Sequence, residues 1–185
     1  MMTFLKQRFA KPSKNAYAVV TGAGSGIGRS FALELAKRGG AVVCADVNLE
    51  AAQETVALLE AQGAKGFAIH CDVGEAGQVK KLAEESEALL GHPVTMVINN
   101  AGVGLGGKFD ELSLDDWKWC MHVNLWGVIH GSRLFARQMI DGHRKGHIVN
   151  VASAAAFAPN RKLTAYSTSK AAVHMLSECL RAELA

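Results

Sequence analysis

Tyr166 and Lys170 stand four residues apart in the stretch YSTSK at residues 166–170. In a helix this spacing places both side chains on one face. A free tyrosine has a pKa of about 10 and is a poor base at neutral pH, but a neighbouring ammonium group favours its phenolate form. The pair therefore predicts a general acid/base that takes a proton from an alcohol or gives one to a carbonyl. The alternative is a chance pair on a helix.

Two polar residues elsewhere fit the same chemistry. Ser153 ends the apolar stretch HIVNVAS (147–153), where its hydroxyl can hold a substrate oxygen. Asn124 lies in the apolar run HVNLWG, and a buried amide needs partners, so we expect a water molecule to link it to Lys170. Alone, Ser153 is also consistent with an ordinary strand-end serine and Asn124 with a helix kink or a packing hydrogen bond. Only the four residues together, Asn124, Ser153, Tyr166 and Lys170, support the acid/base interpretation.

A glycine-rich turn, TGAGSGIG (21–28), joins an apolar segment to a helical one. The sequence assigns Gly22 to a tight turn, Gly26 to close approach of a pyrophosphate, and Gly28 to packing of helix against strand. The free N–H groups at the helix N-terminus also attract phosphate. The turn thus predicts a dinucleotide site, although a glycine cluster alone is equally compatible with a simple turn.

Acidic residues end the next two apolar segments. Asp46 follows Gly28 by 18 residues, can accept both ribose hydroxyls of an adenosine, and would repel a 2′-phosphate. No Lys or Arg occupies 22–28 or 45–49, so NAD is favoured over NADP. Asp72 is placed to accept the adenine amino group. For both residues the alternative is capping of the helix that follows.

Apolar and amphipathic segments alternate from residue 16 onward. Strands are expected at 16–21, 41–46, 65–72, 94–99 and 147–153, and helices at 27–38, 49–61, 75–90, 114–140 and from 166 to the end. This order predicts one doubly wound α/β domain over 16–185, with a parallel sheet covered on both faces, after a basic tail at 1–15. Segment 147–153 would be an unprotected sheet edge, so we expect the chain to lack the C-terminal part of the domain.

Five motifs in order, TGAGSGIG, CDV (71–73), NNAG (99–102), NVAS (150–153) and YSTSK, resemble the short-chain dehydrogenase/reductase family. The resemblance covers about residues 16–185. It implies a three-layer α-β-α, Rossmann-like fold with NAD(P) across the carboxyl edge of the sheet. It also implies a catalytic set of Asn124, Ser153, Tyr166 and Lys170. Family members continue past the last helix into a further strand and a substrate-covering segment.

The same resemblance, with the residues above, gives the expected cofactor site. Asn100, Ala101 and Gly102 would line the cofactor ribose, while Asn99 would tie strands together. The full expected set is Gly22, Ser25, Gly26, Ile27, Gly28, Asp46, Asp72, Val73, Asn100, Ala101, Gly102, Tyr166 and Lys170.

Several function classes are disfavoured. The net charge is +3 and the basic residues are scattered, unlike a nucleic-acid-binding face. The longest apolar runs fall short of a membrane span. Neither a Cys/His cluster nor an HExxH motif predicts a metal, and no G-x-S-x-G elbow predicts a hydrolase. The four cysteines are far apart and form no CxxC pair, so we expect reduced thiols in a cytoplasmic protein.

The sequence therefore predicts an NAD-dependent oxidoreductase that interconverts an alcohol and a carbonyl in a small-molecule substrate. The small and apolar residues of 103–110 and 154–164 favour an uncharged, modestly apolar substrate, although Arg161 and Lys162 allow an anion. The long apolar helix at 116–139 favours a homodimer or homotetramer. The alternatives are a nicotinamide-sensing module without turnover and an NADP-dependent carbonyl reductase.

Overall fold

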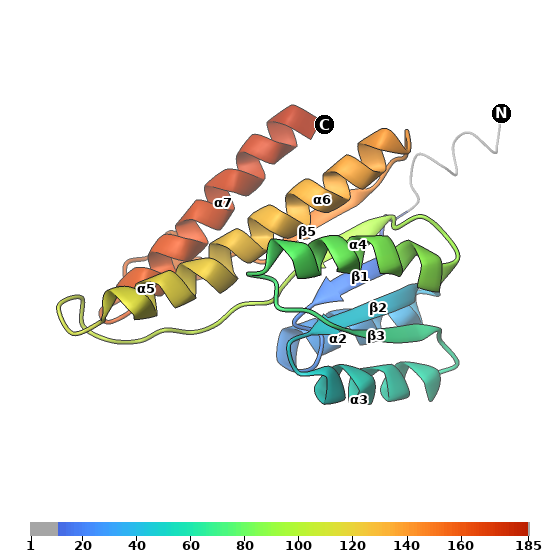
Figure 1. Cartoon of the computed structure of the whole chain (residues 1–185), viewed down its shortest axis with the longest axis horizontal. Coiled ribbons are helices and arrows are strands. Elements are labelled where there is room, and N and C mark those ends of the chain that lie inside the picture. The colour runs from blue at the N-terminus through green and yellow to red at the C-terminus, as the bar shows by residue number, and fades with distance from the viewer. Residues whose placement is uncertain (1–10, 185) are drawn as a thin grey trace.

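The computed structural model describes residues 11–184 and contains a five-stranded parallel sheet with strand order β3-β2-β1-β4-β5 (Figure 1). Its strands are β1 (Tyr17–Thr21), β2 (Ala41–Asp46), β3 (Gly66–His70), β4 (Met96–Asn99) and β5 (His147–Asn150). The helices of the same region are α2 (Gly26–Lys37), α3 (Leu49–Glu60), α4 (Ala76–Leu90), α5 (Leu114–Met121), α6 (Gly127–Asp141) and α7 (Thr164–Leu184). The predicted doubly wound α/β fold is confirmed.

Apolar side chains on both faces of the sheet explain its three layers. Along β1, Ala18 and Val20 pack in a cluster with residues of α2 and α3, whereas Val19 packs in a second cluster with residues of α4 and α6. All three side chains are fully buried. Because β1 is central and buried on both faces, its sequence YAVVT is apolar at nearly every position rather than alternating. Helix α7 packs beside α5 and against β5.

The predicted long helix at 114–140 is one helical run in three parts. A π-helical segment, η1 (His122–Trp126), separates α5 from α6, and in it the N–H of Gly127 donates to the carbonyl of His122. Asn124 lies at the centre of η1. The sequence pattern did not predict this widened turn, because every residue of the segment is compatible with an ordinary helix.

Three predicted boundaries were wrong in ways that affect the site. Strand β5 ends at Asn150, so Ser153 lies beyond it and caps the short 3₁₀ helix η2 (Ala154–Ala156). Strand β3 covers only Gly66–His70, which places Asp72 in the loop that follows it. Helix α7 begins at Thr164, so Tyr166 lies in its first turn. Of the predicted basic tail, residues 1–10 lie outside the described residues.

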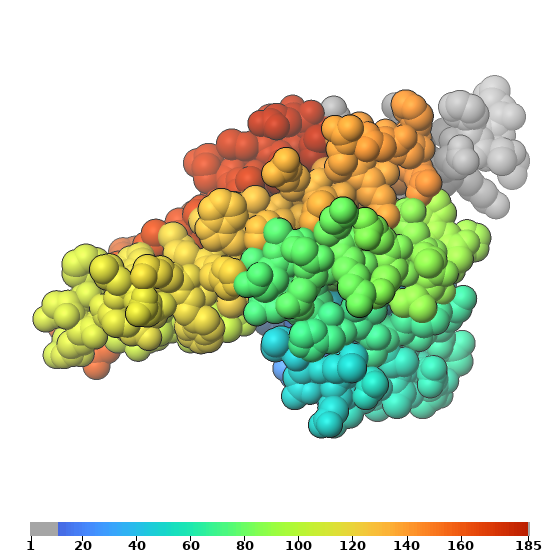
Figure 2. Space-filling view, in the orientation of Figure 1, coloured from blue at the N-terminus to red at the C-terminus, as the bar shows by residue number. Residues whose placement is uncertain are grey.

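Strand β5 forms one edge of the sheet, as predicted, and within residues 11–184 it pairs with β4 alone. The segment that contains α5 projects beyond the body built around the sheet, as the yellow atoms in Figure 2 show. No helix in the described part of the chain has the length and apolar character needed to cross a membrane.

Gly28→Ala is expected to destabilise the fold by about 1–3 kcal/mol, because a new side chain would overpack a rigid contact. A Cβ atom at position 28 would lie 2.0 Å from the carbonyl oxygen of Gly22 and 2.6 Å from Nδ2 of Asn100. Gly77→Ala in α4 is the matched control, since a Cβ there meets nothing within 4 Å. The control is expected to gain about 0.5–1 kcal/mol from the lower entropy of the unfolded chain. Urea unfolding measures both changes, and equal stabilities would contradict the assigned packing role of Gly28.

Candidate active site at the carboxyl edge of the sheet

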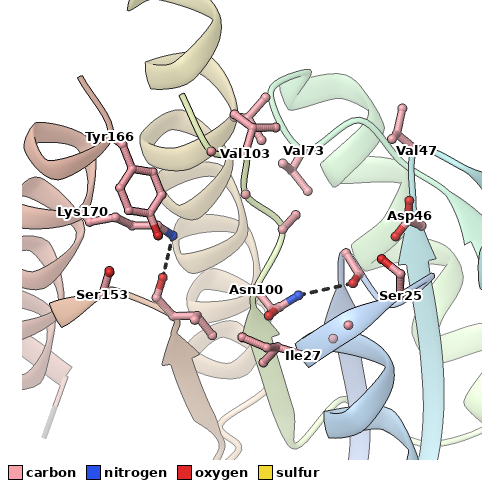
Figure 3. A pocket seen from close by; sticks show the side chains of 18 of the residues that line it. Ser25, Ile27, Asp46, Val47, Val73, Asn100, Val103, Ser153, Tyr166 and Lys170 are labelled. Carbon is pink, nitrogen blue, oxygen red and sulfur yellow. Dashed lines mark hydrogen bonds between the residues drawn. The ribbon is translucent and has the colours of Figure 1, made fainter. Parts of the chain in front are cut away.

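A cleft of about 860 Å³ lies across the carboxyl ends of the strands. Figure 3 shows its two ends, with Tyr166 and Lys170 at one and Asp46 at the other. All thirteen residues of the expected cofactor set line it, and so does Ser153. Val103 and Gly104, from the expected substrate-facing stretch 103–110, also line it. The other lining residues, which the expected site did not include, are Val47, Cys71, Trp119, Val123, Val151 and Ala152. Asn124 is buried beside the cleft and is not part of its lining.

The glycine-rich turn forms the floor of the cleft together with the end of β4. Gly22 and Gly26 have positive φ angles of 64° and 52°, which side chains disfavour. The hydroxyl oxygen of Thr21 accepts hydrogen bonds from the backbone N–H groups of Asn100 (3.0 Å) and Ala101 (3.1 Å). In return, Nδ2 of Asn100 donates to the carbonyl of Thr21 (2.9 Å). Thr21 is a structural residue that the sequence reasoning missed, although a hydroxyl at the end of an apolar strand was its signal.

The N-terminus of α2 is suited to an anion. Its N-cap residue, Ser25, makes no side-chain cap hydrogen bond, and the first turn contains no acidic residue. The first N–H groups of the helix therefore remain available to phosphate oxygens. A side chain at position 26 would meet no protein atom within 4 Å, so the bare backbone there faces open space.

Asp46 links the glycine turn to the loop after β2. One carboxylate oxygen accepts from the N–H of Gly24 (2.8 Å) and the other from the N–H of Asn48 (2.9 Å). The cap of α3 is Asn48, whose side chain accepts from Ala51, so Asp46 is not the helix cap that the alternative required. Arg29, which follows the turn in α2, pairs with Glu54 at 3.0 Å.

Asp72 is likewise not a helix cap. The N-cap of α4 is Glu75, and one carboxylate oxygen of Asp72 accepts instead from the N–H of Gly74 (2.9 Å). Oε1 of Gln78 accepts from the backbone N–H of Asp72 (2.9 Å), which fixes the loop to the first turn of α4. Asp72 itself is one of the residues that line the cleft.

The opposite end of the cleft carries the acid/base candidates. Lys170 is only 4% exposed, and its Nζ donates to the carbonyl of Val151 at 2.8 Å (Figure 3). The same Nζ lies 6.0 Å from the centre of the Tyr166 ring. Burial lowers the pKa of Lys170 below its ordinary value. The hydroxyl oxygen of Ser153 accepts from the N–H of Ala155 (3.1 Å), which leaves its own hydrogen free to donate to a substrate oxygen.

Asn124 connects the π-helical turn to the loop after β4. Its Oδ1 accepts from the N–H of Val103 (2.7 Å), and its Nδ2 donates to the carbonyl of Val103 (3.0 Å) and to Oγ of Ser169 (3.1 Å). Ser169 in turn donates to the carbonyl of Tyr166 (2.7 Å). The side chain of Asn124 thus makes the packing hydrogen bonds of the alternative interpretation. The sequence reasoning missed Ser169, although it is part of YSTSK.

Known proteins share this architecture. The family model for short chain dehydrogenases matches residues 16–185. The chain belongs to the short-chain dehydrogenase family. A structure of such an enzyme from Burkholderia phymatum in complex with NAD is 42% identical with a TM-score of 0.88, over 92% of this chain and 60% of that one. The fold assignment from sequence and the resemblance on which it drew are confirmed.

Relatives of this chain differ widely in length and name. A probable oxidoreductase, EphD, of Mycobacterium tuberculosis is 44% identical over 89% of this chain, which spans only 28% of that protein. A 2,3-dihydro-2,3-dihydroxybenzoate dehydrogenase of Bacillus subtilis is 36% identical over 95% of this chain and 67% of its own length. The chain thus spans less than two thirds of the length of EphD and of the Burkholderia enzyme.

The residues present fit a nicotinamide dinucleotide. The bare backbone at Gly26 and the uncapped N-terminus of α2 suit a pyrophosphate, and Asp46 suits a ribose diol. At the other end, a Cβ on Gly102 would lie 3.1 Å from Oδ1 of Asn124 and 3.4 Å from Nζ of Lys170. A glycine at position 102 therefore allows the backbone to approach Asn124 and Lys170 closely. Among residues 11–184, no three His, Cys, Asp or Glu side chains gather as a metal site.

Lys170→Met is expected to change the pH dependence of stability. Since the pKa of Lys170 is lowered in the folded state, the native chain releases this proton at a lower pH than the unfolded chain. The buried ammonium of Lys170 destabilises the folded state fully below the lowered pKa, and this effect disappears as the pH rises toward the ordinary pKa of 10.5. The unfolding free energy of the wild type should therefore rise relative to that of the variant, by at most about 1.4 kcal/mol per pH unit. Paired urea unfolding from neutral pH upward measures this; a constant difference would contradict it.

Proposed function

We propose that the protein transfers a hydride between NAD(H) and an alcohol or carbonyl substrate, with Tyr166 as the general acid/base. The observation that carries the proposal is the composition of one cleft. A glycine turn and Asp46 lie at one end, and Tyr166, Lys170 and Ser153 lie at the other. Relatives named as dehydrogenases and a structural neighbour crystallised with NAD support the same reaction class.

A bound nicotinamide would supply or accept the hydride. The protein's own contribution is to orient the substrate oxygen and to move its proton. Ser153 donates a hydrogen bond to that oxygen, and the phenol of Tyr166 exchanges the proton with it. Lys170, held by Val151, places a positive charge beside the phenol and stabilises its ionised form. Asn124 and Ser169 hold the turn of α7 that carries Tyr166.

The preference for NAD rests on Asp46. Its carboxylate is fixed by two backbone N–H groups and lies in the lining of the cleft, so a 2′-phosphate would meet a negative charge there. Arg29 does not offset this charge, because Glu54 and the carbonyl groups of Gly24 and Ala51 already engage its guanidinium.

The substrate side of the cleft is apolar. Val103, Trp119 and Val123 line it, whereas Arg161 and Lys162 do not in the part of the chain that the structure describes. We therefore favour an uncharged substrate with an apolar group beside the reacting carbon.

The buried thiols of Cys44 and Cys71 fit a cytoplasmic protein. Burial raises the pKa of each thiol to about 12, which makes both unreactive.

We also propose a homo-oligomer, since the side chains of Trp126 and Ile140 are more than half exposed on the helical run from α5 to α6.

Tyr166→Phe is expected to lower turnover by about 10²–10⁴-fold while NADH binding stays unchanged, because only the proton-transfer group is lost. NADH consumption with a panel of apolar ketones measures turnover, and nicotinamide fluorescence measures binding. Tyr17→Phe is the matched control, since Tyr17 lies at the amino end of β1 and stacks on His92. Undiminished turnover in Tyr166→Phe would refute the assigned role. NADH binding without turnover of any ketone or alcohol by the wild type would favour the sensing module.

Asp46→Asn is expected to weaken NADH binding about tenfold and to strengthen NADPH binding, because a charge that accepts ribose hydroxyls and repels phosphate is removed. Fluorescence titration with both cofactors gives the ratio of dissociation constants. Asp141→Asn, at the exposed end of α6, serves as the control for loss of one negative charge. If the wild type bound NADPH as tightly as NADH, the assignment of NAD would fail.

A further inference from the structure

One helical segment braces the loop that forms the adenine end of the cleft. Nδ1 of His130, in α6, lies 3.0 Å from the carbonyl oxygen of Val73. A carbonyl oxygen only accepts, so Nδ1 carries the hydrogen, and the bond persists whether the imidazole is neutral or protonated. Val73 is 6% exposed and lines the cleft beside Asp72, whereas His130 is not part of the lining.

Two close approaches show that this hydrogen bond belongs to an extended contact. A Cβ on Gly127 would lie 2.5 Å from a methyl group of Val73, so the helix touches the loop through bare backbone there. The ring of His122 covers Gly74, where an added Cβ would lie 2.1 Å from Nε2. Nε2 of His122 also lies 3.4 Å from a carboxylate oxygen of Glu75. The helical segment 122–130 therefore contacts residues 73–75 through His122, Gly127 and His130.

The other bonds of the loop explain why His130 matters. The carboxylate of Asp72 and the side chain of Gln78 hold the N–H groups of Gly74 and Asp72. These contacts fix donors of the loop, whereas the His130 bond fixes the buried carbonyl of Val73. A buried carbonyl without a partner is costly, so loss of the imidazole N–H would leave the carbonyl of Val73 unsatisfied and this peptide held only through the N–H of Gly74.

We propose that His130 is a positioning residue for the dinucleotide, which holds Val73 and Asp72 in the orientation that receives the adenine. The inference rests on the proposed NAD(H) function. His130 is not among the cleft-lining residues around Tyr166 and Lys170, so its loss should raise the Kd and KM for NADH and leave kcat at saturating NADH unchanged.

His130→Phe and His130→Asn separate the hydrogen bond from packing. Phenylalanine keeps a ring of similar shape and removes the donor, and it is expected to weaken NADH binding about tenfold. Asparagine can place its amide N–H near the position of Nδ1 and is expected to restore binding to within about twofold of the wild type. His92→Phe is the matched control, because His92 stacks on Tyr17 at the opposite edge of the sheet. Fluorescence titration gives Kd, and a melting curve of each variant reports folding.

Each outcome bears on the proposal. Wild-type NADH binding together with unchanged binding in His130→Phe would overturn the role of His130 and leave the proposed function intact. Equal weakening in both variants, with a matching fall in Tm, would also overturn it, because packing alone would explain the result. Absence of NADH binding in the folded wild-type protein would overturn the proposed function and this inference with it.

Discussion

At the carboxyl ends of β1 and β4, two chain segments separated by about 80 residues are held together through Thr21 and Asn100. The strand order changes direction between β1 and β4, so the segments leaving these strands pass to opposite faces of the sheet and open a crevice between them. Without contacts between the ends of β1 and β4, this crevice would be an open gap between two loops. The hydrogen bonds of Thr21 and the close contact of Gly22 with Ala101 turn it into a cleft with a fixed floor.

The two ends of the cleft are placed relative to that floor. Strand β2 carries Asp46 to one side of the glycine turn, and the segment after β5 carries Ser153 to the other. Helix α7 then returns along the sheet and buries Lys170 against Val151. Burial of this ammonium is unfavourable for folding, as its lowered pKa shows. In the proposed reaction this charge lies beside Tyr166, and groups with such shifted pKa values are common at functional sites.

Sequence reasoning succeeded where the signal is local. The apolar runs of β1 and β2 are readable from adjacent residues and form the expected strands. The expected glycines, Tyr166 and Lys170 all line the cleft. Sequence reasoning failed where a residue's partner is distant. Thr21 meets Asn100, Asn124 meets Val103, and His130 meets Val73, and none of these pairs leaves a periodic pattern in the sequence. The end of β5 was placed three residues late because Val151 and Ala152 are apolar yet belong to the wall of the cleft.

The π-helical turn η1 explains why both Asn124 and His130 contact loops beside the cleft. Its wider hydrogen bond, from Gly127 to His122, inserts an additional residue between α5 and α6 and rotates one helix relative to the other. As a result, Asn124 faces the loop after β4, while Gly127 and His130 face the loop after β3. One continuous helical segment thus contacts both walls of the cleft. The loop that carries Val73 and the loop that carries Val103 are coupled through it, because a shift of this segment would disturb its hydrogen bonds to both.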